Sequence, residues 1–113
     1  MSLIDSIALM IERHGQDVVV RRRTGTTSSF SPSVTVKGRV HSFRPEELIG
    51  GIQQGDRRVT IAPSVLVSAG WNTGDAPRKG DQVLIDSQVF TVQACEPRYY
   101  AGSLARYDIW IRG

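Results

Sequence analysis

Apolar residues follow two different periods along the chain, and each period predicts a different element. Between residues 3 and 14 they recur at spacings of three and four, which predicts an amphipathic helix. Ser2 and Asp5 form a capping pattern at its start, and Gly15 is expected to end it in the left-handed conformation. The apolar stripe must pack on the domain's own sheet or on a neighbouring subunit.

Period-two alternation predicts strands over much of the remaining chain. Residues 17–25 contain three consecutive valines, and residues 34–43 alternate cleanly, with Gly38 indicating a bulge or a close neighbouring backbone. Residues 57–63 and 106–113 show the same alternation. These four segments therefore predict half-buried strands.

The segment "DQVLIDSQVFTVQAC", residues 81–95, predicts a β-hairpin with its turn near Asp86-Ser87. The turn has no Asn-Gly or Asp-Gly pair, so its type stays open. The inward positions expected to face each other across the turn are Val83, Ile85, Phe90, Val92 and Ala94.

Segments rich in glycine, proline and small polar residues separate these elements. Residues 24–33, 44–56 and 72–81 read as loops or turns, and residues 97–106 as a second substantial loop. Residues 64–70 fit either a strand or a single helical turn.

The predicted fold is mainly β: a small antiparallel β-barrel or sandwich of five or six strands, with an N-terminal α-helix and a long flexible loop near 44–56. The length of 113 residues suits one domain, spanning 1–113. Its helix would occupy residues 1–15 and its barrel residues 17–113.

Composition and net charge make some classes of function less favoured than others. The net charge is +3, from 14 Lys and Arg against 11 Asp and Glu, which is too small an excess to make nucleic-acid binding the default. Twelve of the basic residues are Arg, which fits ion pairs and protein interfaces. The start of the chain has no basic region typical of a signal peptide, and no apolar run reaches the roughly 20 residues of a membrane span. We expect a chain that is cytosolic when made.

Residues with reactive or metal-binding side chains are sparse. His14 and His41 have no second ligand at metal-binding spacing. Cys95, the single cysteine, fits a packing role on the outer face of its strand, or inward if the strand bulges, better than a nucleophile. The glycines at 50, 51 and 55 lack the Lys-Ser/Thr ending of a phosphate loop. We therefore expect no catalytic residue, metal or cofactor, and no enzyme activity.

The basic run Arg21, Arg22 and Arg23 lies on a predicted strand. It fits a solvated or partner-facing edge, where charge also blocks aggregation, better than a phosphate-binding surface. Few exposed aromatic residues accompany it as stacking platforms.

Three stretches in order, "GIQQGDRRVTIAPSVLVSAG", "PRKGDQVLIDSQVFTVQACEPRY" and "RYDIWIRG", resemble the head-closure (head–tail connector, or stopper) proteins of tailed bacteriophages and prophages. The resemblance covers roughly residues 35–113 and rests on Gly55-Asp56, Gly80-Asp81 and the Tyr99-Tyr100 segment. It departs from the family at Asp86-Ser87, where a glycine-bearing turn is more usual.

This resemblance implies a structural protein of the virion neck, made in the host cytoplasm. Its barrel would assemble into a homo-oligomeric ring beneath the portal and adaptor, retain the packaged DNA and receive the tail and its terminator protein. Double-stranded DNA would pass through the ring without sequence specificity, and no membrane or cofactor would take part. Whether the isolated chain is a monomer stays open.

Within that picture, the loop would project toward the lumen or an axial neighbour, with its two glutamates repelling DNA. The candidate loop residues are Glu46, Glu47, Leu48, Ile49, Gly50, Gly51, Ile52, Gln53, Gln54, Gly55 and Asp56. The candidate interface residues are Arg21, Arg22, Arg23, Trp71, Tyr99, Tyr100 and Trp110.

Two other functions stay open. One is a small nucleic-acid-binding barrel of the OB or SH3-like type, which would need a basic face with stacking aromatic residues. The other is a neighbouring neck protein such as a tail terminator.

Overall fold

A computed structural model describes residues 3–23, 30–42, 55–71 and 75–113 of the chain. Of the predicted loop at 44–56, only Gly55 and Asp56 fall within these ranges; residues 46–54 of the candidate site lie outside the described residues. The elements in chain order are α1 (Leu3–His14), β1 (Gln16–Arg23), β2 (Phe30–Ser42), β3 (Arg57–Ile61), α2 (Pro63–Ser68), β4 (Gln82–Ile85), β5 (Gln88–Tyr100) and β6 (Ser103–Arg112).

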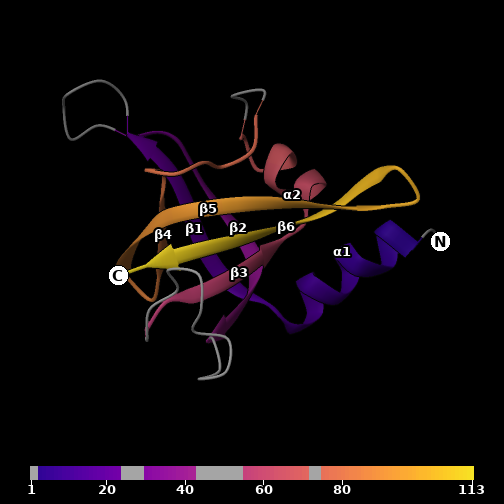
Figure 1. Ribbon diagram of the computed structural model, residues 1–113, viewed down its shortest axis with the longest axis horizontal. Coiled ribbons are helices and arrows are strands. Elements are labelled where there is room, and N and C mark those ends of the chain that lie inside the picture. Colours follow the sequence, from indigo (N-terminus) through magenta and orange to yellow (C-terminus); the bar gives the residue numbers. More distant parts are fainter. Residues whose placement is uncertain (1–2, 24–29, 43–54, 72–74) are drawn as a thin grey trace.

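The six strands form one closed antiparallel barrel in the order β1-β2-β3-β6-β5-β4, and β4 closes it by pairing with β1 (Figure 1). The prediction of a mainly β fold with an N-terminal helix is confirmed, and the alternative of an open sandwich is not what forms. Closure leaves no free edge along the barrel wall, which removes the pairing sites that an open sheet exposes.

The strand alternation read from the sequence matches the burial of β2. Val34, Val36 and Gly38 are buried, whereas Thr35 and Lys37 lie on the outer side. No bulge occurs at Gly38, because its pairing with β1 and β3 is regular. A side chain there would instead crowd the core, since a Cβ would lie 3.0 to 3.3 Å from the side chains of Val18, Val59 and Ile61.

Aliphatic side chains fill the barrel interior, as expected for a barrel of this size. The segment at 64–70 resolves as a helical turn, because Pro63 begins α2 at a position where a missing N–H costs nothing. It contributes Leu66, and Trp71 follows it into the core. The buried cluster also contains Val18, Val20, Val34, Val36, Val59, Ile61, Val83, Ile85, Phe90, Val92, Ile109 and Ile111.

Helix α1 packs on the outer face of β2, β3 and β6 and buries Ile11 there. Part of the apolar stripe of the helix therefore packs on the domain's own sheet. The prediction that Gly15 takes the left-handed conformation is wrong, since the described glycines with positive φ are Gly55, Gly70, Gly80 and Gly102. Gly15 is needed for space: a Cβ there would clash with the carbonyl oxygens of Ile11 and Gly38.

The predicted hairpin at 81–95 is confirmed, with Val83 opposite Phe90 and Ile85 opposite Gln88. Its turn residues Asp86 and Ser87 both have positive φ, 51° and 67°. This is the pattern of a type I′ turn, which matches the twist of the paired strands. Asp tolerates this conformation better than most residues, so the turn forms without glycine.

A register shift between Val92 and Ala94 interrupts β5 where it leaves β4 and pairs with β6. The predicted inward position of Ala94 is wrong, because Ala94 is exposed. The extra residue carries the half-buried Cys95 against the core instead. This is the inward placement that a bulge was expected to produce.

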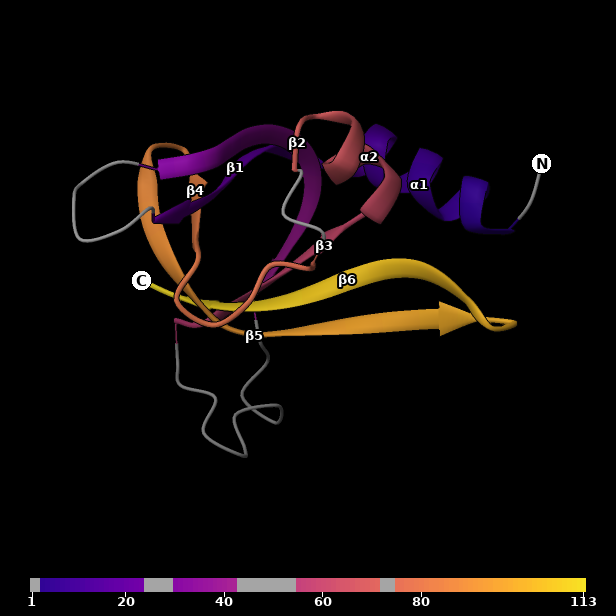
Figure 2. The ribbon, with the colours of Figure 1, turned by 90° about the horizontal axis from the view of Figure 1, so that it is seen from above.

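The loop predicted at 97–106 is also wrong. Strands β5 and β6 continue through it and meet at a two-residue turn, Ala101 and Gly102, with φ values of 50° and 81°. Pro97 and the small residues of the turn made the segment resemble a loop by composition. Figure 2 shows the paired strands extending past the barrel on the same side as the start of α1. We call residues 97–106 the hairpin arm.

Candidate functional site

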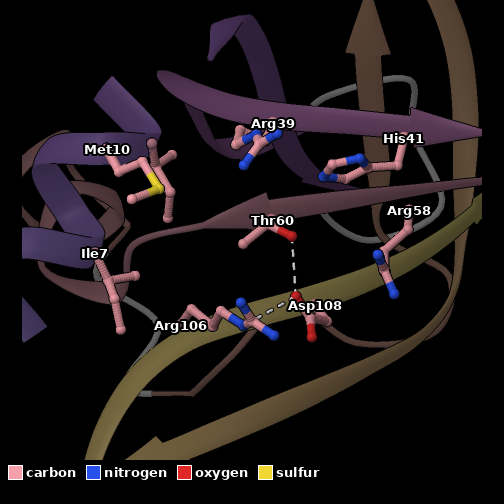
Figure 3. Close-up of a pocket in the computed structure, with 9 residues that line it drawn as sticks. Ile7, Met10, Arg39, His41, Arg58, Thr60, Arg106 and Asp108 are labelled. Carbon is pink, nitrogen blue, oxygen red and sulfur yellow. Dashed lines mark hydrogen bonds and ion pairs between the residues drawn. The ribbon is translucent and has the colours of Figure 1, made fainter. Parts of the chain in front are cut away.

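A pocket of about 250 Å³ lies between α1 and the outer face of β2, β3 and β6 (Figure 3). We call it the helix–sheet pocket. One wall is apolar and comes from the helix, and the floor and far wall are polar and come from the three strands. Its lining residues are Ile7, Met10, Ile11, Arg39, His41, Arg58, Thr60, Arg106 and Asp108.

Strand register brings the polar residues of the pocket together. Arg39 lies opposite Thr60, which lies opposite Asp108, so one row crosses all three strands. His41 lies opposite Arg58 in the next row on the same face. Side chains directly opposite each other on one face of an antiparallel sheet interact, so the two rows form one cluster.

Asp108 forms the floor of the pocket and is only 7% exposed. Its Oδ1 accepts a hydrogen bond from Thr60 Oγ1 at 2.9 Å and lies 3.5 Å from Arg106 Nε. Its Oδ2 accepts a hydrogen bond from Arg98 Nε at 3.2 Å. The carboxylate therefore has its hydrogen bonds and its countercharge supplied by the protein itself.

Arg39 and Arg58 are in a different situation. Within the described ranges, neither has an ion pair with an acidic side chain. The Nε of Arg58 is shielded from solvent, and no hydrogen-bond acceptor in the described chain reaches it. A buried donor without an acceptor is costly, so this N–H is not stabilised by any group of the described chain.

The pKa of His41 depends on its burial and on the charged side chains around it. Burial, followed by the positive charges of Arg39 and Arg58, lowers the pKa of His41 below its ordinary value. Asp108 acts in the opposite direction and Arg106 in the same direction as the other arginines, and the net effect is still a lowered pKa. The imidazole therefore stays neutral near pH 7, and the pocket has a positive field.

Three arginines and one carboxylate line the pocket, leaving a cationic excess beside an apolar wall. Such a lining can hold an anionic group and pack an apolar group next to it. The volume is below the roughly 300–1,000 Å³ typical of small-molecule sites, so it suits a side chain rather than a cofactor. In the described residues, no cluster of three His, Cys, Asp or Glu side chains could hold a metal ion.

The hairpin arm presents a second surface. Tyr99 is 65% exposed and Tyr100 is 53% exposed, both next to the turn at the end of the arm. Tyrosine offers a large contact area at a small entropic cost, which is why it is frequent in protein interfaces. Sequence reasoning predicted these two residues as interface candidates, and both are accessible.

The three arginines predicted as an interface have separate environments. Arg21 donates from Nε to Gln82 Oε1 at 2.9 Å and stacks over Phe30 at 3.7 Å. Arg22 makes two 2.9 Å hydrogen bonds to Asp81. Arg23 is the exposed member of the run.

The two predicted tryptophans and Asp56 have structural contacts. Trp71 is 3% exposed, so this predicted interface residue is instead a core residue, and its Nε1 donates to Asp75 O at 2.9 Å. Trp110 is half-buried and donates from Nε1 to Asp56 at 2.7 Å. Asp56 is buried and also accepts from Arg112 Nε at 2.9 Å, so it anchors the start of β3 to β6.

The lone cysteine lies outside the pocket lining. Burial raises the pKa of Cys95 to about 11, with smaller contributions from Asp108 and Asp81. A thiol with a raised pKa is a poor nucleophile near pH 7. This agrees with the packing role predicted for it.

Sequence reasoning did not bring together the pocket residues Arg39, Arg58, Arg106 and Asp108. A partial signal is present, because the clean alternation over residues 34–43 places the polar residues 35, 37, 39 and 41 on one face of the strand. The residues from β3 and β6 could not be added, because the order of the strands and their register were unknown.

Comparison with known proteins does not assign the chain to a family. Models of known families give no match, and curated proteins give no significant match. Among the helices of the described residues, none is long and apolar enough to cross a membrane.

Proposed function

We propose that the chain is a non-catalytic assembly domain, a closed barrel that presents surfaces to other protein subunits. Within that class, we assign it to the head-closure proteins of the neck of tailed bacteriophages. Several copies would form a ring beneath the portal and adaptor, retain the packaged DNA and offer the surface to which the tail attaches.

The observation that carries this proposal is the hairpin arm. It extends two paired strands past the barrel and places two exposed tyrosines near its turn. An isolated domain gains little from such an extension, because apart from the small Ala105 the arm adds exposed aromatic surface rather than buried apolar surface. A subunit of a ring needs such surface, since each copy must show complementary faces to its neighbours.

The filled barrel interior supports a ring rather than a single pore. Side chains of both halves of the wall meet inside the barrel, so DNA cannot pass through one protomer. A channel wide enough for double-stranded DNA would have to be enclosed by several protomers. The small net charge of +3 is compatible with DNA sliding past without tight binding.

The proposal is tested by inactivating the gene in the genome that encodes the chain and examining lysates by electron microscopy. We expect filled or leaking heads and free tails in place of joined virions. A plasmid copy should restore joining, and the double variant Tyr99→Ser/Tyr100→Ser should not, with a loss of infectious titre of at least about a hundredfold. The variant Tyr99→Phe/Tyr100→Phe keeps both rings and serves as the matched control.

The outcomes separate the two parts of the proposal. Normal virions after gene inactivation would overturn the neck assignment. Failure of joining after inactivation, together with full rescue by the Ser variant, would keep the neck assignment and remove the arm from the interface. Both tyrosines are exposed, so we expect stability changes within about 0.5 kcal/mol, which circular dichroism can verify.

The cationic lining of the helix–sheet pocket also favours a second candidate, a nucleic-acid-binding barrel. It is distinguished by gel shifts of purified protein with duplex and single-stranded DNA. Tight binding that weakens steeply with salt would favour this candidate over the neck assignment.

A further inference from the structure

Packing of α1 on the sheet does not by itself explain the charges that line the helix–sheet pocket. Arg39 and Arg58 have no acidic partner among the described residues, while Asp108 is already compensated by Arg98 and Arg106. Arg58 also has a shielded Nε without an acceptor. The pocket thus carries cationic groups whose partners are not supplied from within the described chain.

The shape of the pocket restricts what can enter. Its floor residues Thr60 and Asp108 are each 7% exposed, and α1 covers one side. A single side chain fits such a recessed floor, whereas a DNA duplex would contact only the outer part of the pocket. The apolar wall also argues against a free inorganic anion, because Ile7 and Met10 would then face a hydrated ion.

The partly exposed Met10 is the adaptable element of that wall. It is 53% exposed and lies at the rim, beside Ile7. Methionine fits irregular apolar partners because its side chain is unbranched and polarisable. A partner segment that carries a carboxylate next to an apolar residue would therefore complement both halves of the pocket.

We infer that the helix–sheet pocket is a docking site for an acidic segment of a different protein, whose Asp or Glu carboxylate binds between Arg39 and Arg58 while an adjacent apolar side chain packs on Ile7 and Met10. In the proposed ring the copies would contact each other through the hairpin arm, so we assign the cationic pocket to a different, acidic partner. The inference deepens the proposed function, since an assembly domain needs such partners. Its test uses the isolated chain and is independent of head–tail joining.

The test is an NMR titration of the ¹⁵N-labelled full chain with the peptide acetyl-Leu-Glu-Glu-Leu-amide. We expect saturable shifts of the Arg39 and Arg58 Nε–H signals, with a Kd of the order of 1 mM, as is reasonable for a short unstructured peptide. A carboxylate beside His41 also favours its protonated form, so the pKa of His41 should rise on binding. The matched peptide acetyl-Leu-Gln-Gln-Leu-amide should bind at least about tenfold more weakly, because its amides cannot form charge-assisted hydrogen bonds with the guanidinium groups.

Variants assign the binding to this pocket. Arg58→Met should weaken binding of the Glu peptide at least about tenfold, and Arg39→Met should do the same if the first variant folds poorly. Arg23→Met removes the same charge from an exposed position on β1 and should leave the affinity within about twofold.

Four results of the peptide titrations would overturn the inference. These are equal binding of the Gln peptide, unchanged affinity in both pocket variants, no pocket shifts up to about 10 mM peptide, or displacement of the peptide by a DNA duplex or by equimolar inorganic phosphate. Pocket shifts that follow protein dilution without peptide would show that a second copy is the occupant, which also overturns it.

Discussion

Arg22 and Arg58 are arginines on strands of the same barrel, but their surroundings differ. The guanidinium of Arg22 lies 2.9 Å from both carboxylate oxygens of Asp81 and 3.1 Å from Asp75 Oδ1. These hydrogen bonds raise the pKa of Arg22, the bond to Asp81 most. Arg58 has no acidic partner in the described part of the chain, and its Nε is shielded without an acceptor.

The difference shows that two arginines in one small fold can contribute differently to its stability. Asp81 is buried, and without Arg22 its charge would have no guanidinium partner, so this pair stabilises the arrangement in which it is formed. Arg112 and the buried Asp56 form the same kind of ion pair where β3 and β6 meet. Arg58 compensates no buried carboxylate in the described chain, and the partner that we propose for it is an acidic segment of another protein.

The largest expected effect comes from breaking the paired arginine. Arg22→Met leaves the buried Asp81 carboxylate without its bidentate partner, so we expect a loss of about 3 kcal/mol in the free energy of unfolding. Denaturation by urea, followed by tryptophan fluorescence, measures it. Arg23→Met, one residue along the same strand and exposed, should change stability by less than about 0.5 kcal/mol. Equal losses in the two variants would mean that the Asp81 pair is not what stabilises this region.

A smaller effect is expected at Cys95, a half-buried titratable group with no cationic partner among the residues that the structure describes. Burial raises its pKa from 9.0 to about 11, so between these values the unfolded chain releases the thiol proton while the folded chain keeps it. Deprotonation therefore favours the unfolded state, and stability falls as the pH rises through this window. Allowing for the partial exposure of the side chain, we expect a loss of about 1 kcal/mol.

The matched variant for this effect is Cys95→Ala, which has no thiol to titrate. Tyrosines and lysines titrate in both proteins, so the difference between their unfolding free energies isolates the cysteine. Between pH 8 and pH 11 the wild type should lose about 1 kcal/mol more of its unfolding free energy than Cys95→Ala does. Parallel stability curves over this range would show that Cys95 titrates as an exposed thiol.

Local pattern was enough to predict most of the barrel wall. In β2 and β3 the alternation assigned the inward residues because one face is buried and the period of a strand is two. The β4–β5 hairpin was also predictable, since its strands adjoin in sequence and its turn holds only Asp86 and Ser87.

The sequence did not predict the hairpin arm, because its composition is typical of a loop whereas its residues pair as two strands. Pro97 and Gly102 are typical of loops, but the segment gains its strand structure from the partner strand across the turn. The bulge at residues 92–94 was only one of two alternatives for Cys95, because it arises where β5 leaves β4 and pairs with β6. Such changes depend on which strands meet, not on the residues of one strand.

The helix–sheet pocket could not be predicted for the same reason. Arg39, Thr60 and Asp108 are far apart in the sequence and form one row only through the β2-β3-β6 order. A shift of one residue in either register would send Asp108 or Thr60 to the core face. The sequence did indicate an outward polar face on β2, but not which side chains complete it.

The smallest stability effect is expected at the arginine without a partner. Arg58→Met removes a guanidinium whose Nε lacks an acceptor and keeps the aliphatic part of the side chain, so we expect stability within about 0.5 kcal/mol of the wild type, or slightly higher. The same urea denaturation measures it, beside Arg22→Met. A loss of about 2 kcal/mol or more would show that Arg58 is held by an internal partner and would bring the two arginines into one class. A small change would show that the Arg58 guanidinium contributes little to folding, so that weaker peptide binding in this variant reports on the pocket rather than on stability.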